Sequence, residues 1–381
     1  MKFNIHHLAV AALAVLTMAS QSCTLTGDED ISDEALSIRV ENALITADGK
    51  DFARIIVKEG DREIKEGVTI YNAKTNKPEN LTDLCFSTTT PGTYRFWASY
   101  KTKSTIPSEA VSITAISGAV PQLPKDPSPE KVSFERKVFF TQFTGNTCGW
   151  CPYVTRLLRE YATVSDNFVH AACHSYKSND PAYFSGGLPN AMAILGYPTL
   201  IINLDKTLRF STGATLRDLQ DIVSKELASS DALAGLCAST ILDGEDLIIR
   251  IGIKAANDGE YRIGAWILED CIYAKQINNG ASKELENGEI IDFNTHNNCL
   301  RATIGQSKSG DYFGSPVSLK KGETAEQSFI VPLYEALHPE KQWIGENCHV
   351  VVYVTTPNGS SYKVNNVIDC PANGSVAYKY N

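Results

Sequence analysis

The sequence predicts an exported multidomain protein in which an α/β domain lies between two all-β sandwiches. Three observations predict this arrangement: a short apolar run at the N-terminus, alternating strand patterns at both ends of the remaining chain, and a mixed strand and helix pattern between them. At 381 residues the chain is long enough for two or three domains. The composition, 43% hydrophobic and 21% charged, is typical of a folded protein, and the net charge of −9 argues against a nucleic-acid partner.

Residues 1–22 have the pattern of a signal peptide. The apolar run Leu8–Met18 follows a positively charged start and is shorter than the roughly 20 residues that a membrane-spanning helix needs. The segment ends before Cys23, where a lipoprotein carries its acylated cysteine, although Ser20 replaces the aliphatic residue usual at that position. We expect lipidation of Cys23 and a tether over residues 23–32. Ordinary cleavage, which leaves Cys23 as a free thiol, is the alternative.

Residues 33–117 alternate apolar and polar positions in short runs that turn signals separate. Tyr94 and Phe96, for example, fall on one face of a predicted strand. This pattern predicts an immunoglobulin-like β-sandwich. Residues 118–137 contain four prolines and alternating charges, which is typical of a semi-extended linker.

The pattern changes between residues 138 and 231, where short apolar runs alternate with helical spacing. The predicted elements are strands over Val138–Phe143 and Phe168–Cys173, a helix over Pro152–Tyr161, a helical turn over Ala191–Leu195, a hairpin over Leu200–Phe210 and a helix capped by Thr215. The order β-α-β-α-β-β-α predicts an α/β domain. Residues 232–381 return to alternating strands and turns, which predict a second, larger β-sandwich.

The motif Cys148-Gly149-Trp150-Cys151 stands where the first predicted strand of the α/β segment gives way to the first helix. Two cysteines at this spacing can open and close a disulfide with little backbone movement. The N-terminus of a helix lowers the pKa of the first thiol, in known cases to about 3.5–7.5. The motif Tyr197-Pro198-Thr199 precedes a later strand, and we expect Pro198 to follow a cis peptide bond that faces the two cysteines.

These two motifs and the order of the elements resemble the thioredoxin superfamily. Four longer runs are similar to the lipoproteins related to the twenty-eight-kilodalton outer-membrane protein, in which a thioredoxin-like domain precedes a β-rich C-terminal domain. The runs are Phe143–Pro152, Trp266–Asp270, His296–Ala302 and Cys348–Val354. This resemblance covers roughly residues 138–381 and implies location and architecture more than a reaction.

In a thioredoxin-like site, Cys148 is the exposed nucleophile that attacks a substrate disulfide, and Cys151 resolves the mixed disulfide. Trp150 offers an apolar contact to a bound peptide. The backbone of Tyr197, beside Pro198, pairs with an extended substrate strand, and we place Thr199 among the substrate-binding residues.

One position departs from the thioredoxin pattern. Thioredoxins place a buried acid six residues before the first cysteine, and this chain has Gln142 there, whose amide cannot relay a proton. A permanently closed structural disulfide on a non-catalytic binding scaffold is therefore the alternative hypothesis. A zinc site needs a second pair of ligands at short spacing, and the adjacent Cys173 and His174 point to opposite faces of a strand, so we expect no metal. His174 either perturbs Cys148 or is a solvated loop residue.

The other cysteines fit an oxidising compartment. Cys348 and Cys370 are equally far from Gly359, so a hairpin that turns at Asn358-Gly359 predicts a disulfide between them. Cys271 and Cys299 are a candidate second pair. Seven cysteines remain when Cys23 and the CxxC pair are left out, so at least one is free. We expect that one to be a buried Cys85 or Cys173.

We therefore expect a thiol-disulfide oxidoreductase of the cell envelope that needs no cofactor and acts on envelope or surface proteins with thiols or disulfides. A lipid anchor would hold it at the outer membrane, on the periplasmic or the exposed side. A surface binding or structural lipoprotein is the alternative. His296 and Arg301 are expected at loop and strand positions, and neither belongs to a recognisable catalytic group.

Overall fold

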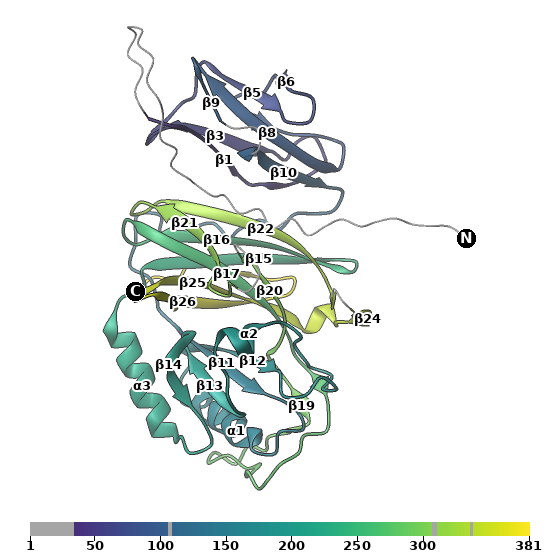
Figure 1. Cartoon of the computed structure of the whole chain (residues 1–381), viewed down its shortest axis with the longest axis vertical. Helices are drawn as coiled ribbons and strands as arrows, with labels where there is room; N and C mark the ends of the chain where they lie inside the picture. Colours follow the sequence, from purple (N-terminus) through teal and green to yellow (C-terminus); the bar gives the residue numbers. More distant parts are fainter. Residues whose placement is uncertain (1–33, 106–108, 307–310, 336–337) are drawn as a thin grey trace, which may run out of the picture. The chain divides into compact units, whose positions relative to one another are not determined.

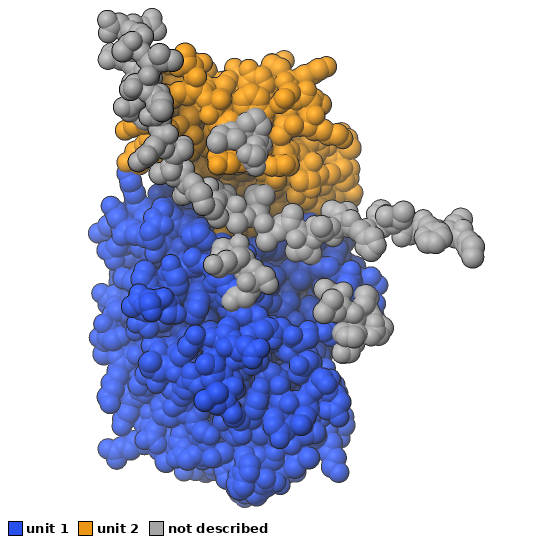
Figure 2. Space-filling model, viewed as in Figure 1, with its two compact units in different colours: residues 1–12, 121–325, 329–381 blue, residues 13–120, 326–328 orange. Residues whose placement is uncertain are grey.

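The computed structural model describes residues 34–105, 109–306, 311–335 and 338–381. The expected signal peptide, Cys23 and the tether lie outside these residues. The described chain forms two compact units, one up to Val120 with Glu326–Ser328, the other Pro121–Ala325 with Phe329–Asn381 (Figure 2). Within the described residues, no helix has the length and apolar character to cross a membrane.

The N-terminal unit is a two-sheet β structure. Its first sheet contains β1 (Leu36–Glu41), β3 (Ala53–Glu59), β4 (Arg62–Glu63) and β7 (Cys85–Phe86). Its second sheet contains β2 (Leu44–Thr46), β5 (Val68–Asn72), β6 (Lys77–Glu79), β8 (Gly92–Tyr100), β9 (Lys103–Ser104) and β10 (Val111–Ile116). Alternate residues of both sheets, among them Ile55, Val57, Phe96 and Ile113, form one buried core, as the period of two predicts.

The second unit begins with strands and helices. They are β11 (Val138–Thr144), α1 (Cys151–Ala162), β12 (Phe168–His174), α2 (Leu188–Ala191), β13 (Thr199–Ile202), β14 (Asp205–Phe210) and α3 (Leu216–Ser229). Strand β11 is buried on both faces: Val138 and Phe140 pack on the side of α1 and α3, whereas Phe139 and Phe143 face the side of α2 (Figure 1). Beside β11, strand β12 runs parallel and β13 antiparallel.

The remaining elements of this unit are almost all strands. They are β15 (Ala234–Asp243), β16 (Asp246–Ala255), β17 (Gly259–Glu269), β18 (Ile272–Tyr273), β19 (Thr295–His296), β20 (Cys299–Ile304), β21 (Ser315–Leu319), β22 (Thr324–Pro332), β23 (Tyr334–Glu335), β24 (His338–Gln342), the 3-10 turn η2 (Gly345–Asn347), β25 (Cys348–Asn358), β26 (Ser361–Pro371) and β27 (Ser375–Val376). One sheet, β22-β16-β15-β27, packs against β17 and β25 through a large aliphatic core.

A parallel pairing between β12 and β20 joins the two parts of this unit. Ala172 lies opposite Cys299, and the amide of Ala172 donates to the carbonyl of Asn298 at 2.8 Å. The result is one nine-stranded sheet whose path runs β14-β13-β11-β12-β20-β17-β25-β26, with β21 also paired to β17. The segments expected on either side of residue 231 therefore share a sheet and belong to one compact unit.

The proline-containing segment expected as a linker packs on this unit from residue 121 onward. Phe134 is buried against Tyr378 and Cys237, and its backbone forms a bridge with Tyr380. The ammonium of Lys254 lies 2.9 Å from a carboxylate oxygen of Asp126.

The structure corrects both expected disulfides outside the CxxC motif, because Cys348, Cys370, Cys271 and Cys299 are all free thiols. The β25–β26 hairpin turns between Asn358 and Ser361 and has an extra residue near position 365, so Val350, two residues beyond Cys348, lies opposite Cys370. In the other pair, Cys299 lies opposite Glu269, the last residue of β17, and Cys271 falls on the exposed chain beyond it.

Buried Asn203 links three segments of the α/β part. Its side-chain oxygen accepts from the amide of Phe139 at 2.9 Å, its side-chain nitrogen donates to Glu226 at 3.0 Å, and its φ of 54° is left-handed. Asn203→Ala is expected to lower the free energy of unfolding by about 3 kcal/mol, because two buried groups lose their partner and alanine disfavours this φ. Urea unfolding measures the loss. The exposed Asn190→Ala is the control, and an equal loss in both variants would contradict the assignment.

His349 predicts a pH dependence of stability. Burial lowers the pKa of His349, but Asp270 and Asp369 outweigh it and raise the value to about 9; the ring nitrogen Nδ1 lies 2.7 Å from an Asp369 oxygen. Because the folded value is raised, this stabilisation is fully present below about pH 6.5 and is lost as the pH rises through about 9. Its upper limit is about 3 kcal/mol. Urea unfolding between pH 6 and 10 should show this decline, and His349→Gln should flatten it; an unchanged slope would refute the assignment.

Candidate active site

The CxxC motif forms the turn between β11 and α1. Cys148 and Cys151 are joined by a disulfide, with their Cα atoms 5.4 Å apart. Helix α1 begins at Cys151 and has Pro152 in its first turn, where a missing N–H costs no helical hydrogen bond. Once the disulfide is reduced, the N-terminal dipole of α1 stabilises a thiolate at this position.

The second motif reaches the same edge of the sheet. Thr199, the first residue of β13, lies opposite Phe143 near the end of β11, and the Tyr197–Pro198 peptide bond is cis. The Tyr197 hydroxyl lies 3.0 Å from the hydroxyl of Ser175, and the Thr199 hydroxyl donates to the Gly196 carbonyl at 2.8 Å. The fold thus brings both motifs to the loops at one end of β11.

The structure corrects the expectation that Cys148 is exposed. In the disulfide form Cys148 is 4% exposed and Cys151 is 1% exposed, whereas Trp150 between them is 52% exposed. Both cysteines of the disulfide are therefore buried, whereas the side chain of Trp150 is half exposed to solvent.

A segment more than a hundred residues further along the chain is hydrogen-bonded to the CxxC turn. We call Gln276–Ala281 the covering segment. The amide of Ile277 donates to the Asn146 carbonyl at 2.8 Å, and the amide of Asn279 donates to the Gly149 carbonyl at 2.8 Å. The side chain of Gln276 donates to the Cys148 carbonyl at 3.0 Å. Residues on both sides of Cys148 are thus hydrogen-bonded to the C-terminal part of the unit.

Helix α1 also holds the chain around the covering segment. The Tyr153 hydroxyl donates to the Asn279 carbonyl at 3.4 Å, and Arg156 donates to the Glu284 carbonyl at 3.4 Å. Tyr153 packs against a small buried cluster of Ala281, Leu285, Ile291 and Phe293. Sequence reasoning missed this contribution, because the polar run Gln276–Gly280 indicates a loop but not where the loop lies.

Gln142, six residues before Cys148, lies on β11. It is buried, and its side-chain nitrogen donates to the Thr155 hydroxyl at 3.0 Å. Thr155 in turn donates to the Cys151 carbonyl at 3.4 Å. The amide is thus connected to the first turn of α1 but has no proton to exchange near neutral pH.

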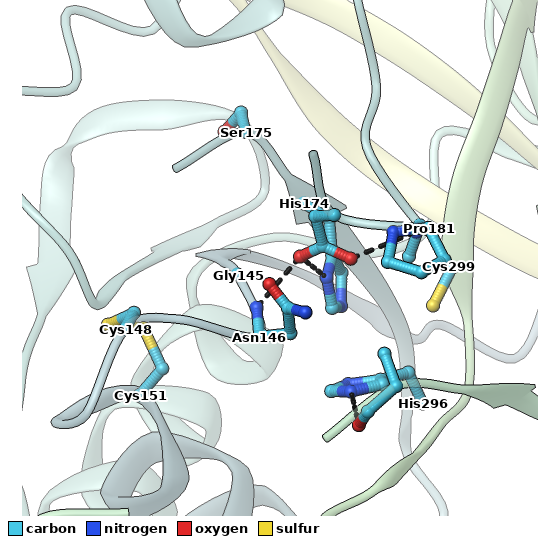
Figure 3. A network of polar contacts seen from close by, with 12 residues as sticks. Gly145, Asn146, Cys148, Cys151, His174, Ser175, Pro181, His296 and Cys299 are labelled. Atoms are coloured by element: carbon cyan, nitrogen blue, oxygen red, sulfur yellow. Dashed lines mark hydrogen bonds and ion pairs between the residues drawn. A yellow bond between two sulfur atoms is a disulfide. The ribbon is translucent and has the colours of Figure 1, made fainter. Parts of the chain in front are cut away.

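His174 is buried and paired, so the alternative of a solvated loop histidine was wrong. Its ring nitrogen Nδ1 lies 2.8 Å from Oδ2 of Asp180, and the same oxygen accepts from the amide of Asn146 at 2.7 Å (Figure 3). The amide of Ala182 donates to the other Asp180 oxygen at 2.9 Å. Burial raises the pKa of Asp180, but His174 and the two amides outweigh it and lower the value to about 2. Asp180 is therefore a carboxylate that accepts from all three groups.

His296 and Arg301, expected without a catalytic group, both lie near this network. The His296 ring packs edge-on against His174, with centroids 4.8 Å apart, and its Nε2 lies 3.1 Å from the Ala274 carbonyl. Burial lowers the pKa of His296 to about 4, so this imidazole is neutral. Arg301 pairs with the buried Glu269 at 2.6 Å and donates to the Pro181 carbonyl at 3.0 Å.

A cavity of about 570 Å³ lies beneath α1 and next to the CxxC turn. The part of its wall near the motif is polar and comes from the sheet, the helix and the segment before β20. These wall residues include Gln142, Thr144, Thr155, His170, His174, Gln276, His296 and Asn298. The rest of the lining includes apolar residues such as Leu158, Phe168 and Phe293, and the polar residues near the motif could bind water molecules in this part of the cavity.

The other thiols near the sheet are poor nucleophiles at neutral pH. Burial raises the pKa of Cys173, Cys348 and Cys370 to about 12 and that of Cys299 well above its usual value. These cysteines stay protonated at neutral pH, and a thiol is far less nucleophilic than a thiolate. Among the described residues, no group of three or more His, Cys, Asp or Glu side chains is arranged to hold a metal ion.

We compared the chain with protein-family models, curated proteins and solved structures. No protein-family model matches the chain, and no curated protein matches its sequence. Among solved structures, it is similar to HBP35 of Porphyromonas gingivalis at 16% sequence identity and a TM-score of 0.49, over 64% of this chain and 77% of that chain.

Gly149 allows a direct test of the cover. A Cβ atom at Gly149 would lie 2.4 Å from the side-chain oxygen of Asn279, so Gly149→Ala must displace that side chain. If one hydrogen bond between the covering segment and the CxxC turn weakens by about 1 kcal/mol, the fraction of molecules in which the segment has detached from the turn rises about fivefold. We expect iodoacetamide to modify reduced Cys148 faster by that factor, as measured by mass spectrometry.

Two controls accompany this variant. Gly196→Ala places its Cβ where no atom lies within 4 Å and should leave the rate unchanged. Adding Asn279→Ala to Gly149→Ala removes the clashing side chain and should restore the original rate. Equal rates in Gly149→Ala and the unsubstituted protein would show that the cover does not limit access.

Proposed function

We propose that this protein is a thiol-disulfide oxidoreductase of the cell envelope, with Cys148 and Cys151 as its reactive pair in a thioredoxin-like α/β fold. The observation that carries the proposal is the Cys148–Cys151 disulfide at the first turn of α1. The order β11-α1-β12-α2-β13-β14-α3 supports the thioredoxin-like assignment, as do parallel β12 and antiparallel β13 on either side of β11.

The proposed exchange needs no cofactor, because the sulfur atoms carry both electrons. The Cys148 thiolate attacks one sulfur of a substrate disulfide, and the other substrate sulfur leaves as a thiolate that takes up a proton. The Cys151 thiol then loses its proton and attacks Cys148 in the mixed disulfide. The substrate leaves as a dithiol, reduced by two electrons, and the Cys148–Cys151 disulfide re-forms. The same steps in reverse oxidise a substrate dithiol.

Substrate recognition is proposed on the side of Trp150 and Tyr197. Trp150 is half exposed and offers an apolar contact to a partner protein. The backbone of Tyr197 and the adjoining Thr199 stand at the sheet edge, where an extended substrate segment would run beside Pro198. Because Cys148 is 4% exposed, a protein partner must displace the covering segment before its sulfur can reach the site.

The proposed location rests on the N-terminal sequence. A signal peptide over residues 1–22 and acylation of Cys23 would anchor the protein at the outer membrane, and its partners would be envelope or surface proteins with thiols or disulfides.

The burial of the disulfide favours a second candidate function, a surface-binding or structural lipoprotein whose CxxC bond stays closed. Four hydrogen bonds hold the covering segment on the CxxC turn and the loop before it, and a disulfide that never opens would need no access. The reduction potential separates the two candidates: structural disulfides typically lie below about −300 mV, and exchange-active pairs lie above it.

The enzyme proposal predicts which cysteine traps partners. Cys151→Ser leaves Cys148 to attack but removes the thiol that resolves the mixed disulfide, so disulfide-linked partner complexes should accumulate in the envelope fraction. Non-reducing electrophoresis followed by mass spectrometry detects them.

Cys148→Ser is the matched control and should trap at least tenfold less, because the remaining Cys151 is the more deeply buried thiol. If neither variant traps a partner and the reduction potential falls below about −300 mV, the structural candidate holds.

A further inference from the structure

We propose that His174, held by Asp180, is the proton acceptor that activates Cys151 when the mixed disulfide is resolved. This inference rests on the proposed exchange reaction and deepens it, because it assigns the proton step to a residue outside both motifs. The amide of Gln142 occupies the position where thioredoxins carry a buried acid, and Cys151 is 1% exposed, so bulk solvent has little access to its thiol.

The hydrogen bond to Asp180 determines which nitrogen of the His174 ring carries the hydrogen. Asp180 is ionised and can only accept, so Nδ1 of His174 carries the hydrogen in the bond to Asp180. The opposite nitrogen, Nε2, is then the basic atom of the neutral imidazole. A carboxylate behind a histidine also stabilises the imidazolium that forms when the ring takes up a proton.

The sheet register brings His174 to the site. His174 lies opposite Thr144 in the parallel pairing of β12 with β11, so both stand at the edge from which the CxxC turn departs. Both residues line the cavity that Pro152 and Thr155, in the first turns of α1, line from the other side. Cys151 directly precedes Pro152 in α1, so the proposed path of its proton runs through water in this cavity to His174.

Asp180 ties the same histidine to the loop that carries the nucleophile. Its Oδ2 accepts from both His174 and the amide of Asn146 (Figure 3). The Asn146 carbonyl in turn accepts from the amide of Ile277 in the covering segment. One carboxylate therefore positions the proton acceptor and the loop before Cys148 together.

Charged and titratable groups around His174 come from several elements. His170 on the same strand has its pKa lowered to about 3 by burial, and His296 on β19 has its pKa lowered to about 4 by burial. Both imidazoles are therefore neutral near pH 7, and the thiol of buried Cys299 on β20 stays protonated. The Arg301 guanidinium is already paired with Glu269. Asp180 is left as the charged group that contacts the ring directly.

The proposed step conserves protons, electrons and sulfur–sulfur bonds. The Cys151 thiol gives its proton to Nε2 of His174 through cavity water, and the resulting thiolate attacks the Cys148 sulfur of the mixed disulfide. The Cys148–Cys151 bond forms as the bond from Cys148 to the substrate sulfur breaks. The substrate leaves as a thiolate, which takes a proton from solvent, and His174 later returns its proton to the cavity.

Rapid-quench kinetics separate this step from the first. The reduced full-length chain is mixed with glutathione disulfide, quenched with acid and alkylated, and mass spectrometry counts the mixed disulfide and the closed Cys148–Cys151 form. In His174→Gln we expect mixed-disulfide formation within about twofold of the unsubstituted protein and ring closure slower by about 10²-fold. Closure in the variant should also become proportional to hydroxide concentration, because only thiol ionised by solvent then reacts.

His296→Gln is the matched control, since it replaces a second histidine of the same cavity and should leave closure within about twofold. His174→Ala provides a readout that a purely structural role would not change: added imidazole should restore closure by at least tenfold. Asp180→Asn should slow closure without changing the overall stoichiometry of exchange.

The outcomes are distinguishable. If His174→Gln closes at the unsubstituted rate, or if imidazole fails to rescue His174→Ala while its mixed disulfide still forms, His174 is not the proton acceptor. If the unsubstituted protein forms no mixed disulfide with glutathione disulfide and Cys151→Ser traps no protein partner, the proposed exchange function fails, and this inference fails with it. Should His174→Gln not fold, Asp180→Asn and the imidazole experiment decide the question.

Discussion

The parallel pairing of β12 with β20 is the constraint on which the arrangement of the second unit depends. It extends the sheet of the α/β segment into the β-rich segment, so Trp266 and Tyr353 pack against Phe139 in a common core. The chain between β17 and β20 must then return along this sheet to begin β20 beside β12. On that path residues 276–279 bond to the CxxC turn and the loop before it. The cover is thus a consequence of the shared sheet.

This arrangement changes what a CxxC motif at a helix N-terminus can do. An open motif meets any thiol that diffuses to it, whereas both cysteines of this disulfide are buried and the turn that carries them is hydrogen-bonded to the covering segment. In the proposed exchange, access to sulfur and delivery of protons would depend on separate parts of the chain. The covering segment is hydrogen-bonded to the CxxC turn, whereas His174, which lines the cavity, would accept the proton.

Local patterns predicted the elements of the site but not their long-range partners. The apolar run from Val138 and the helical spacing after Pro152 match β11 and α1 within a residue or two, because burial on both faces and one apolar stripe leave strong periodic signals. Nothing local indicates that Asn279 contacts Gly149. The Cys348–Cys370 prediction was wrong for a similar reason, since the extra residue at Asn365 is held by distant bonds to Leu233 and Asp231.

The shared sheet also bears on how such a protein can evolve. Here the edge of β12 is completed by β20, and a copy cut after residue 231 would expose the amide of Ala172 and its neighbours as an open strand edge. Residues 138–231 and the β-rich segment after them are therefore expected to occur together in related proteins.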